Sequence, residues 1–387
     1  MTEISRSVLH DLVDHRSPNS VSLYMPTHPA GADTRQDPIR LKNLLRAAVD
    51  ELTGTGLTEG HARERLTPAA ALLEDGDFWR HQANGLAVFV DDGRRWVYRV
   101  PLEVEERVFV GDRFYLKPLL PLLGNSDAFF LLALSQNDVR LLQATRHDVH
   151  RVPLDNAPRC LAELSSFYDF ERHIQFHTGS AAHRVGARRA ATFHGQGVGT
   201  DETADKTRIR EFCRLVEVAV RKGLADRSVP LVLAAADPLV GLYREVNTYP
   251  HLHSSVLHGN YERASDADIH REAVRALSSV FDQPRLAAAA EYRRLAGGKL
   301  ASCDLQEVLR AAFVDRVDTL FVSMEDYRWG RFDPEHGMAD IHGDRQPADE
   351  DLLDLAAVRA LRGKGGVFAV ARGEMPAESP IAATFRF

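Results

Sequence analysis

Residues 188–199 read RRAATFHGQGVG, and three of the last five positions are glycine. Glycine has no Cβ, so it adopts positive φ angles and lets a backbone come close to a ligand. Gln196 stands between Gly195 and Gly197, and two arginines open the stretch. This pattern predicts a flexible loop that presents one amide side chain beside positive charge.

A basic helix is predicted directly after this loop, from about residue 205 to residue 222, where Gly223 ends it. Its apolar side chains recur at helical spacing and form one stripe: Ile209, Phe212, Cys213, Val216 and Val220. Lys206, Arg210 and Arg214 recur every four residues, so they share one side of the helix beside that stripe.

The local charge of this part of the chain differs from that of the whole. Residues 184–227 hold ten Lys or Arg against six Asp or Glu, whereas the full chain of 387 residues has a net charge of −7. A local basic patch suits an RNA backbone, and a plain solvated helix face is the alternative interpretation.

Both sides of the loop carry α/β signals. Residues 128–134 and 139–143 are apolar runs that flank a polar Gln-Asn-Asp turn, which predicts a hairpin, and residues 229–236 predict a buried strand. Between them, residues 155–204 lack a clean period. Long irregular stretches in compact chains usually carry function, so we expect the site there.

The N-terminal segment predicts a mixed α/β domain. Residues 21–25 resemble a strand that a proline stops, and Asp37-Pro38 predicts a helix start with Asp37 as the N-cap. Residues 85–90 and 96–100 flank an Asp-Asp-Gly turn and predict a second hairpin.

The C-terminal segment also alternates helix and strand patterns, which favours an α/β sandwich. Helices are expected at 269–281 and 305–312, and strands at 319–323, 366–371 and 382–387. The polar tract 333–351 is expected to be an exposed loop, and a contact surface for a partner is the alternative. With the length of the chain, these signals predict an α/β (α+β) protein of three domains, at residues 1–125, 126–260 and 261–387.

Composition indicates a reducing, aqueous compartment. Cys160, Cys213 and Cys303 lie far apart, form no CxxC pair and are odd in number. The first residues are polar, unlike a signal peptide, and the longest apolar runs have only the length of a strand. We therefore expect a cytoplasmic protein with no membrane partner.

Other kinds of chemistry are not predicted. No GxxxxGK[ST] loop and no GxSxG elbow occur in the sequence. The histidines form two groups: His173, His177, His183 and His194, then His251, His253 and His258. No HExxH motif accompanies them, so we expect hydrogen-bonding or RNA-stacking imidazoles, with no metal and no cofactor.

With these features in place, the chain resembles the archaeo-eukaryotic peptide-chain release factor and pelota superfamily, in its bacterial branch, over nearly its whole length. Release factors of that superfamily carry a Gly-Gly-Gln loop before an Arg-rich helix, and here His194-Gly195-Gln196-Gly197 precedes Lys206-Thr207-Arg208-Ile209-Arg210. The resemblance implies a ribonuclease-H-like middle domain and a pelota-like C-terminal domain. It also implies that Tyr243–Leu252 joins these two domains.

The resemblance implies site residues in and beside the loop. In the family's release factors the Gln and its backbone help to place the water that attacks the peptidyl-tRNA ester, so Gln196 and Gly195 are the catalytic candidates. His194 stands where the family has its first Gly, and a Cβ there restricts φ. The RNA-binding candidates are basic or loop residues: Arg184, Arg188, Arg189, His194, Gly197, Lys206, Arg208, Arg210 and Arg214.

Stop-codon reading of the family's kind is not predicted. No Asn-Ile-Lys-Ser occurs before Leu44. The family's Tyr-x-Cys-x-x-x-Phe would fall on Val108, Val110 and Phe114, and only the Phe is present.

Three functions stay open at this point. The first is a translation factor that binds the A site of the 70S ribosome, through ribosomal RNA and tRNA, in ribosome hibernation or rescue. The second is a peptidyl-tRNA hydrolase that uses Gln196, and the third is a stand-alone RNA-binding module. The resemblance further implies a translational GTPase, such as elongation factor Tu, as a partner of the C-terminal domain.

Overall fold

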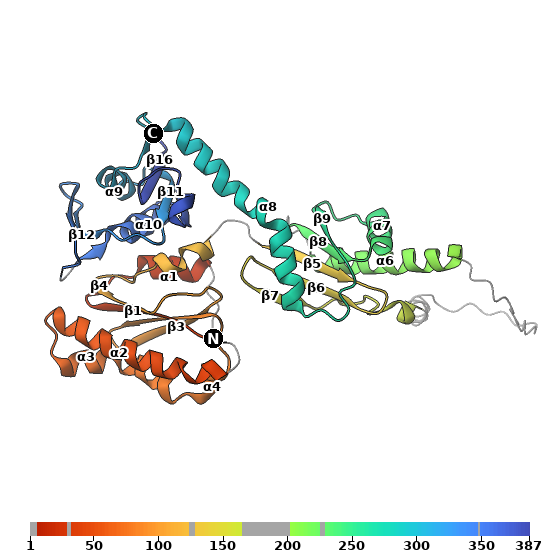
Figure 1. Cartoon of the computed structure of the whole chain (residues 1–387), viewed down its shortest axis with the longest axis horizontal. Helices are drawn as coiled ribbons and strands as arrows, with labels where there is room; N and C mark the ends of the chain where they lie inside the picture. Colours follow the sequence, from red (N-terminus) through yellow and green to blue (C-terminus); the bar gives the residue numbers. More distant parts are fainter. Residues whose placement is uncertain (1–5, 29–31, 124–127, 165–201, 225–228, 347–348) are drawn as a thin grey trace, which may run out of the picture. The chain divides into compact units, whose positions relative to one another are not determined.

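The computed structural model describes residues 6–28, 32–123, 128–164, 202–224, 229–346 and 349–387. The chain divides into two compact units: unit 1 comprises residues 1–125 and 282–387, and unit 2 comprises residues 126–281. The described residues form several sheets with helices packed on them, so the predicted mixed α/β class is confirmed (Figure 1). The three domain boundaries stay a prediction.

The described part of unit 2 is built on a five-stranded sheet with the strand order β7-β6-β5-β8-β9. The strands are β5 (Phe129–Leu134), β6 (Val139–Ala144), β7 (Val149–Val152), β8 (Leu231–Ala235) and β9 (Leu252–His258). Strands β5, β6 and β7 are antiparallel neighbours, whereas β8 runs parallel to both β5 and β9. The predicted hairpin and the predicted buried strand are both confirmed.

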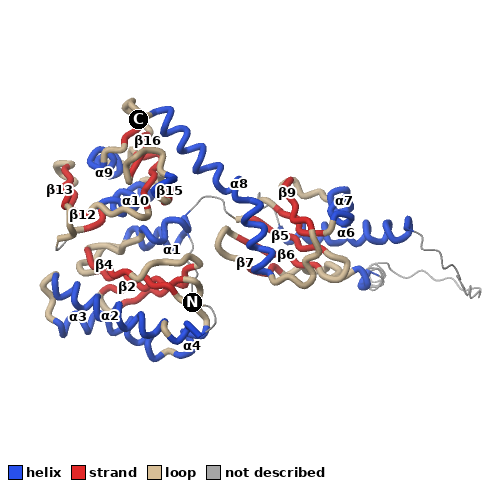
Figure 2. The backbone as a smooth tube through the Cα atoms, viewed as in Figure 1, coloured by secondary structure: helices blue, strands red, loops and turns tan. Residues whose placement is uncertain are grey.

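Helices cover both faces of this sheet (Figure 2). They are α6 (Glu202–Leu224), α7 (Asp237–Val246) and α8 (Asp266–Leu295). The even-numbered residues 130–134 of β5 pack with α6 and α7, and the odd-numbered residues 129–133 pack with the first half of α8. Because both faces are buried, β5 is a continuous apolar run.

The stretch Tyr243–Leu252 lies inside unit 2, where it connects α7 to β9. Buried Glu217 of α6 accepts hydrogen bonds from the backbone N–H and the hydroxyl of Thr248, at 3.0 and 2.5 Å. The Tyr249 hydroxyl donates to the Val229 carbonyl at 2.6 Å. The implied role of this stretch as a connection between domains is therefore wrong, because its polar groups make hydrogen bonds within unit 2.

The N-terminal part of unit 1 is a four-stranded antiparallel sheet with the order β3-β2-β1-β4. Its strands are β1 (Ser20–Pro26), β2 (Gly85–Asp91), β3 (Arg94–Val100) and β4 (Arg107–Gly111). The helices of this part are α1 (Arg6–Asp14), α2 (Asp37–Gly54), α3 (Glu59–Ala70) and α4 (Gly76–Arg80). The predicted first strand and hairpin are confirmed, and Gly93 at φ 77° makes the hairpin turn.

The start of α2 differs from the prediction. Asp37 is the first helical residue, and the N-cap is Gln36, which makes no side-chain cap bond. The Asp37 carboxylate is fully buried and bonds to the backbone N–H and the ring Nδ1 of His28, both at 3.0 Å. A buried carboxylate needs such donors, so its tertiary partner replaces the cap.

The C-terminal part of unit 1 contains two more sheets, with the orders β10-β16-β11-β15 and β13-β12-β14. The strands are β10 (Ala301–Ser302), β11 (Val317–Ser323), β12 (Trp329–Asp333), β13 (Met338–His342), β14 (Glu350–Asp351), β15 (Gly366–Val370) and β16 (Ile381–Phe385). The helices are the second half of α8, α9 (Leu305–Phe313) and α10 (Leu352–Arg362).

The exposed loop expected at residues 333–351 is wrong for much of that tract. It contains β13 and β14, which both pair with β12. Asp349 and Asp351 are buried there, and Asp349 accepts from the ring of His342 at 2.8 Å. The polar composition of this tract therefore did not reveal that Asp349 and Asp351 are buried.

The two parts of unit 1 share one hydrophobic core. On β1 and β2, Leu23 and Val88 pack with α2 and α3, whereas Tyr24 and Phe89 pack with residues of α9, β11 and α10. Both faces of the N-terminal sheet are therefore buried, the second one in part by a segment that is more than 200 residues away in sequence.

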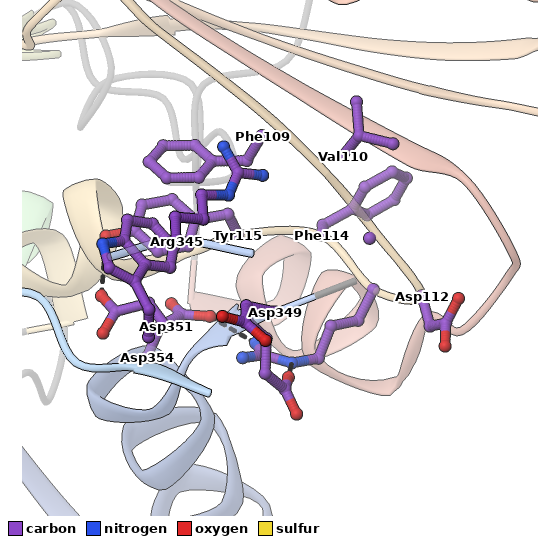
Figure 3. A pocket seen from close by; sticks show the side chains of 13 residues that line it. Phe109, Val110, Asp112, Phe114, Tyr115, Arg345, Asp349, Asp351 and Asp354 are labelled. Carbon is purple, nitrogen blue, oxygen red and sulfur yellow. Dashed lines mark hydrogen bonds and ion pairs between the residues drawn. The ribbon is translucent and has the colours of Figure 1, made fainter. Parts of the chain in front are cut away.

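A buried network of ion pairs crosses the same boundary. Lys117 lies 3.2 Å from Asp351, and Arg113 pairs with Asp354 and with Glu350. Figure 3 shows Asp349, Asp351 and Asp354 gathered near the rings of Phe109 and Tyr115, and the Tyr115 hydroxyl donates to Asp351 at 3.1 Å.

Among the helices that the structure describes, none combines the length and the apolar character that crossing a membrane requires.

Candidate RNA-binding surface

Helix α6 carries the described part of the predicted site. The predicted apolar stripe is confirmed: Phe212, Cys213, Val216 and Val220 are fully buried, and Ile209 is partly buried. Burial raises the pKa of the Cys213 thiol to about 12, so this cysteine is a packing residue and not a nucleophile. The helix is thus anchored on the sheet from residue 212 onward.

The first residues of α6 whose burial the structure describes have no buried face. Residues 205–208 are all exposed, one after another, and Figure 1 shows this end of the helix extending past the sheet. Lys206 and Arg208 lie on it, and no described ion pair neutralises either charge. The segment that follows the glycine loop is therefore a projecting helix end that presents two exposed cations, Lys206 and Arg208, beside the carboxylate of Asp205.

Two further predicted cations are exposed and already paired. Arg210 donates two hydrogen bonds to Glu245 of α7, at 3.1 and 2.9 Å. Arg214 binds Glu211 one turn earlier, with the closest contact at 2.7 Å. Exposed pairs of this kind stabilise a fold by about 1 kcal/mol or less, so a phosphate can replace the carboxylate at little cost.

Two cations of the same helix were not among the predicted site residues. Arg221 and Lys222 are exposed in the last turn of α6. Arg221 follows Arg214 by seven residues, or two turns, so it continues the edge that Arg210 and Arg214 form. The sequence signal for Arg221 was this spacing.

The other predicted site residues lie outside the described residues. These are the glycine-loop residues and the arginines before them: Arg184, Arg188, Arg189, His194, Gly195, Gln196 and Gly197. The structure therefore brings together only the four candidates on α6.

The described histidines make local contacts. The His251 ring lies edge-on to the ring of Tyr249, with centroids 5.6 Å apart, and His253 Nδ1 accepts from the Ser255 N–H at 3.0 Å. His258 pairs with Asp237. Within the described ranges, no three His, Cys, Asp or Glu side chains cluster closely enough to hold a metal ion.

The positions of the family's codon motif are not on an exposed surface. Val110 and Phe114 are buried, and Val108 is partly buried. The Phe114 ring stacks on His15 with centroids 4.3 Å apart and an angle of 6°. The one residue that matches the motif is thus part of the core of unit 1.

The part of the chain that carries this surface matches a known protein family. Residues 129–279 match the model of the bacterial archaeo-eukaryotic release factor family 7. This segment belongs to that family. It contains α6 and the glycine loop, so the predicted resemblance is confirmed where the candidate site lies.

Solved structures show a looser similarity. An archaeal translation termination factor, aRF1, is 15% identical, with 98% of this chain and 96% of that chain covered and a TM-score of 0.23. Archaeal Pelota, from a model of its ribosome-bound complex with ABCE1, is 13% identical, with 78% and 77% covered and a TM-score of 0.34. Dom34 from S. cerevisiae is 9% identical, with 79% and 73% covered and a TM-score of 0.35. No curated protein matches the sequence.

Proposed function

We propose that this protein is a ribosome-associated translation factor of the bacterial release-factor type, which binds the A site in ribosome hibernation or rescue. The observation that carries this proposal is the projecting start of α6 with the exposed cations Lys206 and Arg208, which follows the loop His194-Gly195-Gln196-Gly197 inside the family-matching segment. In this proposal the loop extends toward the peptidyl-transferase centre, and α6 contacts the surrounding RNA.

The charges of α6 fit a contact with an RNA backbone. Lys206 and Arg208 are exposed and have no described ion pair, and Arg210 and Arg214 are paired with carboxylates that are at least partly exposed. Each phosphate that a Lys or Arg neutralises releases counterions, so binding of this kind weakens as salt rises. The net charge of −7 opposes nonspecific coating of nucleic acid and leaves this helix as the local exception.

Co-sedimentation with 70S ribosomes between about 50 and 200 mM salt tests the proposal. We expect the wild type to sediment with ribosomes at low salt and the double variant Lys206→Glu/Arg208→Glu to lose most of this binding. The matched control is Arg293→Glu/Lys299→Glu, which makes the same change of charge at exposed positions of unit 1. The proposal fails when the wild type does not sediment at low salt, or when both double variants bind equally.

The tripeptide Gly195-Gln196-Gly197 favours a second candidate function, hydrolysis of the peptidyl-tRNA ester. In it Gln196 positions the attacking water, and His194 narrows the backbone freedom of the loop. Peptide release from ribosomes that carry peptidyl-tRNA tests this role. It predicts release by the wild type and none by Gln196→Ala, and equal release by both proteins removes Gln196 from the chemistry.

The finer points of the resemblance complete the proposal. The middle domain is ribonuclease-H-like, at residues 126–260, the C-terminal domain at 261–387 is a pelota-like α/β sandwich, and the protein acts in the cytoplasm. A translational GTPase such as elongation factor Tu is the proposed partner. Retention of purified elongation factor Tu with GTP on the immobilised full chain tests the partner, and absence of retention in the presence of ribosomes rejects it.

A further inference from the structure

A small pocket opens at one edge of the sheet of unit 2, away from any residue assigned a role above. It has a volume of about 210 Å³ and lies beyond the carboxyl ends of β5, β8 and β9. The chain leaves β5 toward β6 on one side, while the parallel strands β8 and β9 lie on the other. Open α/β sheets bind ligands at such a change of direction, outside the carboxyl ends of the strands.

The walls of the pocket are held in place before any ligand arrives. Ser135 Oγ accepts from the N–H groups of Asn137 and Asp138, at 3.1 and 2.9 Å, which fixes the turn after β5. The side chain of Arg140 is 8% exposed and donates to the carbonyls of Tyr261 and Ala264, at 2.5 and 3.0 Å. A preformed site loses less conformational entropy on binding.

The chemistry of the lining selects the class of ligand. Among the described residues that line the pocket, none is Lys, Arg or His, and Glu262 is the one that carries a charge. A phosphate is therefore disfavoured. Leu134 and Leu239 supply apolar contact, and Gln136 and Asn260 supply amide groups.

Glu262 is oriented as an acceptor. Its Oε1 accepts from Asn137 Nδ2 at 3.0 Å, and its backbone N–H donates to Asn260 Oδ1 at 3.1 Å. A carboxylate has about four lone-pair sites, so this contact leaves capacity for a ligand with adjacent N–H donors. The Watson–Crick edge of guanine carries two such donors, and unpaired RNA bases are recognised on that edge.

We propose that this pocket binds an unpaired guanine base of RNA, with Glu262 accepting from the base edge. The inference rests on the proposed function, which supplies the RNA, and it adds a base-reading contact to the backbone contact of α6. The volume lies below the roughly 300–1,000 Å³ of pockets for drug-sized ligands, which suits one base with its sugar and phosphate outside. The residues that line the pocket all fall inside the family-matching segment.

Fluorescence anisotropy with the full-length protein tests the inference. The probes are labelled hexauridylates with one central guanosine, inosine or adenosine. We expect the guanosine probe to bind roughly fivefold or more tightly than the adenosine probe, because one bidentate base contact discriminates by about 5–150-fold. Inosine keeps one of the two donors, so it should fall between them.

Glu262→Gln removes the charge and keeps an acceptor for Asn137, so we expect a stable protein whose three affinities agree within about twofold. The matched control Asp155→Asn removes an exposed carboxylate of unit 2 outside the pocket and should keep the guanine preference. Equal binding of the three probes by the wild type, or a preference that survives in Glu262→Gln, overturns the inference. Competition by argininamide that exceeds competition by guanosine also overturns it, in favour of an arginine side chain of a protein partner.

Ribosome co-sedimentation of the same samples separates this inference from the proposed function. A wild type that sediments with ribosomes and shows no guanine preference overturns the pocket inference alone. A guanine preference without sedimentation supports the pocket and rejects the ribosome as the source of the RNA.

Discussion

Two groups of ion pairs in this protein, in which an arginine or a lysine faces a carboxylate, differ in their exposure to solvent. In unit 1, Arg113 and Lys117 are 9% and 1% exposed, and they face Asp354 and Asp351, which have no exposed side-chain surface. On α6, Arg210 and Arg214 are 43% and 49% exposed and face carboxylates that are also exposed to solvent.

The contrast separates two uses of the same interaction. Solvent screens the α6 pairs, so a competing phosphate can take either arginine at a small free-energy cost. The unit 1 pairs have no such substitute, because loss of one partner leaves a desolvated charge. The pairs of unit 1 therefore hold the fold, and the pairs of α6 leave their cations available.

The largest expected effect follows from removing one buried partner. Asp354→Ala leaves Arg113 without its closest carboxylate and the Leu116 N–H without an acceptor. We expect the free energy of unfolding of unit 1 to fall by about 3–5 kcal/mol. Urea unfolding followed by tryptophan fluorescence measures it, because Trp79, Trp96 and Trp329 all lie in unit 1. The control Asp77→Ala breaks an exposed pair with Arg80, and an equal loss in both variants contradicts the comparison.

A buried carboxylate that makes no ion pair with the described residues gives an intermediate effect. Glu217→Ala removes the acceptor of both Thr248 bonds in unit 2. We expect a loss of about 1–3 kcal/mol, measured by urea unfolding with circular dichroism. Glu217→Gln keeps an acceptor and should lose less, so a larger loss in the Gln variant would show that the charge itself matters.

Releasing the exposed cations sharpens the comparison from the other side. The double variant Glu211→Gln/Glu245→Gln removes the two negative charges that pair with Arg214 and Arg210, and its stability should change by less than about 1 kcal/mol. Its ribosome binding should strengthen at low salt, and the slope of log affinity against log salt should steepen by up to about two. An unchanged slope would place these two arginines outside the RNA contact.

The smallest effect is a pH dependence in the sheet of β12, β13 and β14. The hydrogen bond to Asp349 raises the pKa of His342, and the charges of Asp349 and Asp340 add to this. The stabilisation is therefore fully present below the unfolded pKa of about 6.5 and is lost as pH rises through the higher folded pKa. The difference in Tm between the wild type and His342→Gln should shrink from about pH 6 to about pH 8.5. His61→Gln, an exposed histidine of α3, should show no such trend.

Features set by local periodicity could be predicted from the sequence. The apolar stripe of α6 follows a helical period, and the hairpins follow apolar runs on either side of turn residues, so both were found. Features set by tertiary partners could not be predicted in this way. The Asp37 carboxylate bonds to His28 and does not cap its helix, and Glu245 on another helix pairs with Arg210.

The shared core of unit 1 lies furthest beyond such patterns. Nothing in the sequence around Tyr24 and Phe89 indicates that they pack against residues from the last quarter of the chain. In the sequence, Asp351 and Asp354 resemble solvent-exposed charges, although both are buried in ion pairs. Seven of the eleven predicted site residues, those of the glycine loop and the arginines before it, lie outside the described residues. The part of the loop in the site therefore rests on the family match and on its position before α6.

The two parts of the shared core are also synthesised at different times. Residues 1–125 leave the ribosome first, with one face of their sheet still lacking the segment that covers it. At roughly 5–20 residues per second, that segment arrives on the order of tens of seconds later, after all of unit 2 has been made. Throughout that interval a nascent chain of this protein thus lacks the part of the cover over Tyr24 and Phe89 that α9, β11 and α10 supply.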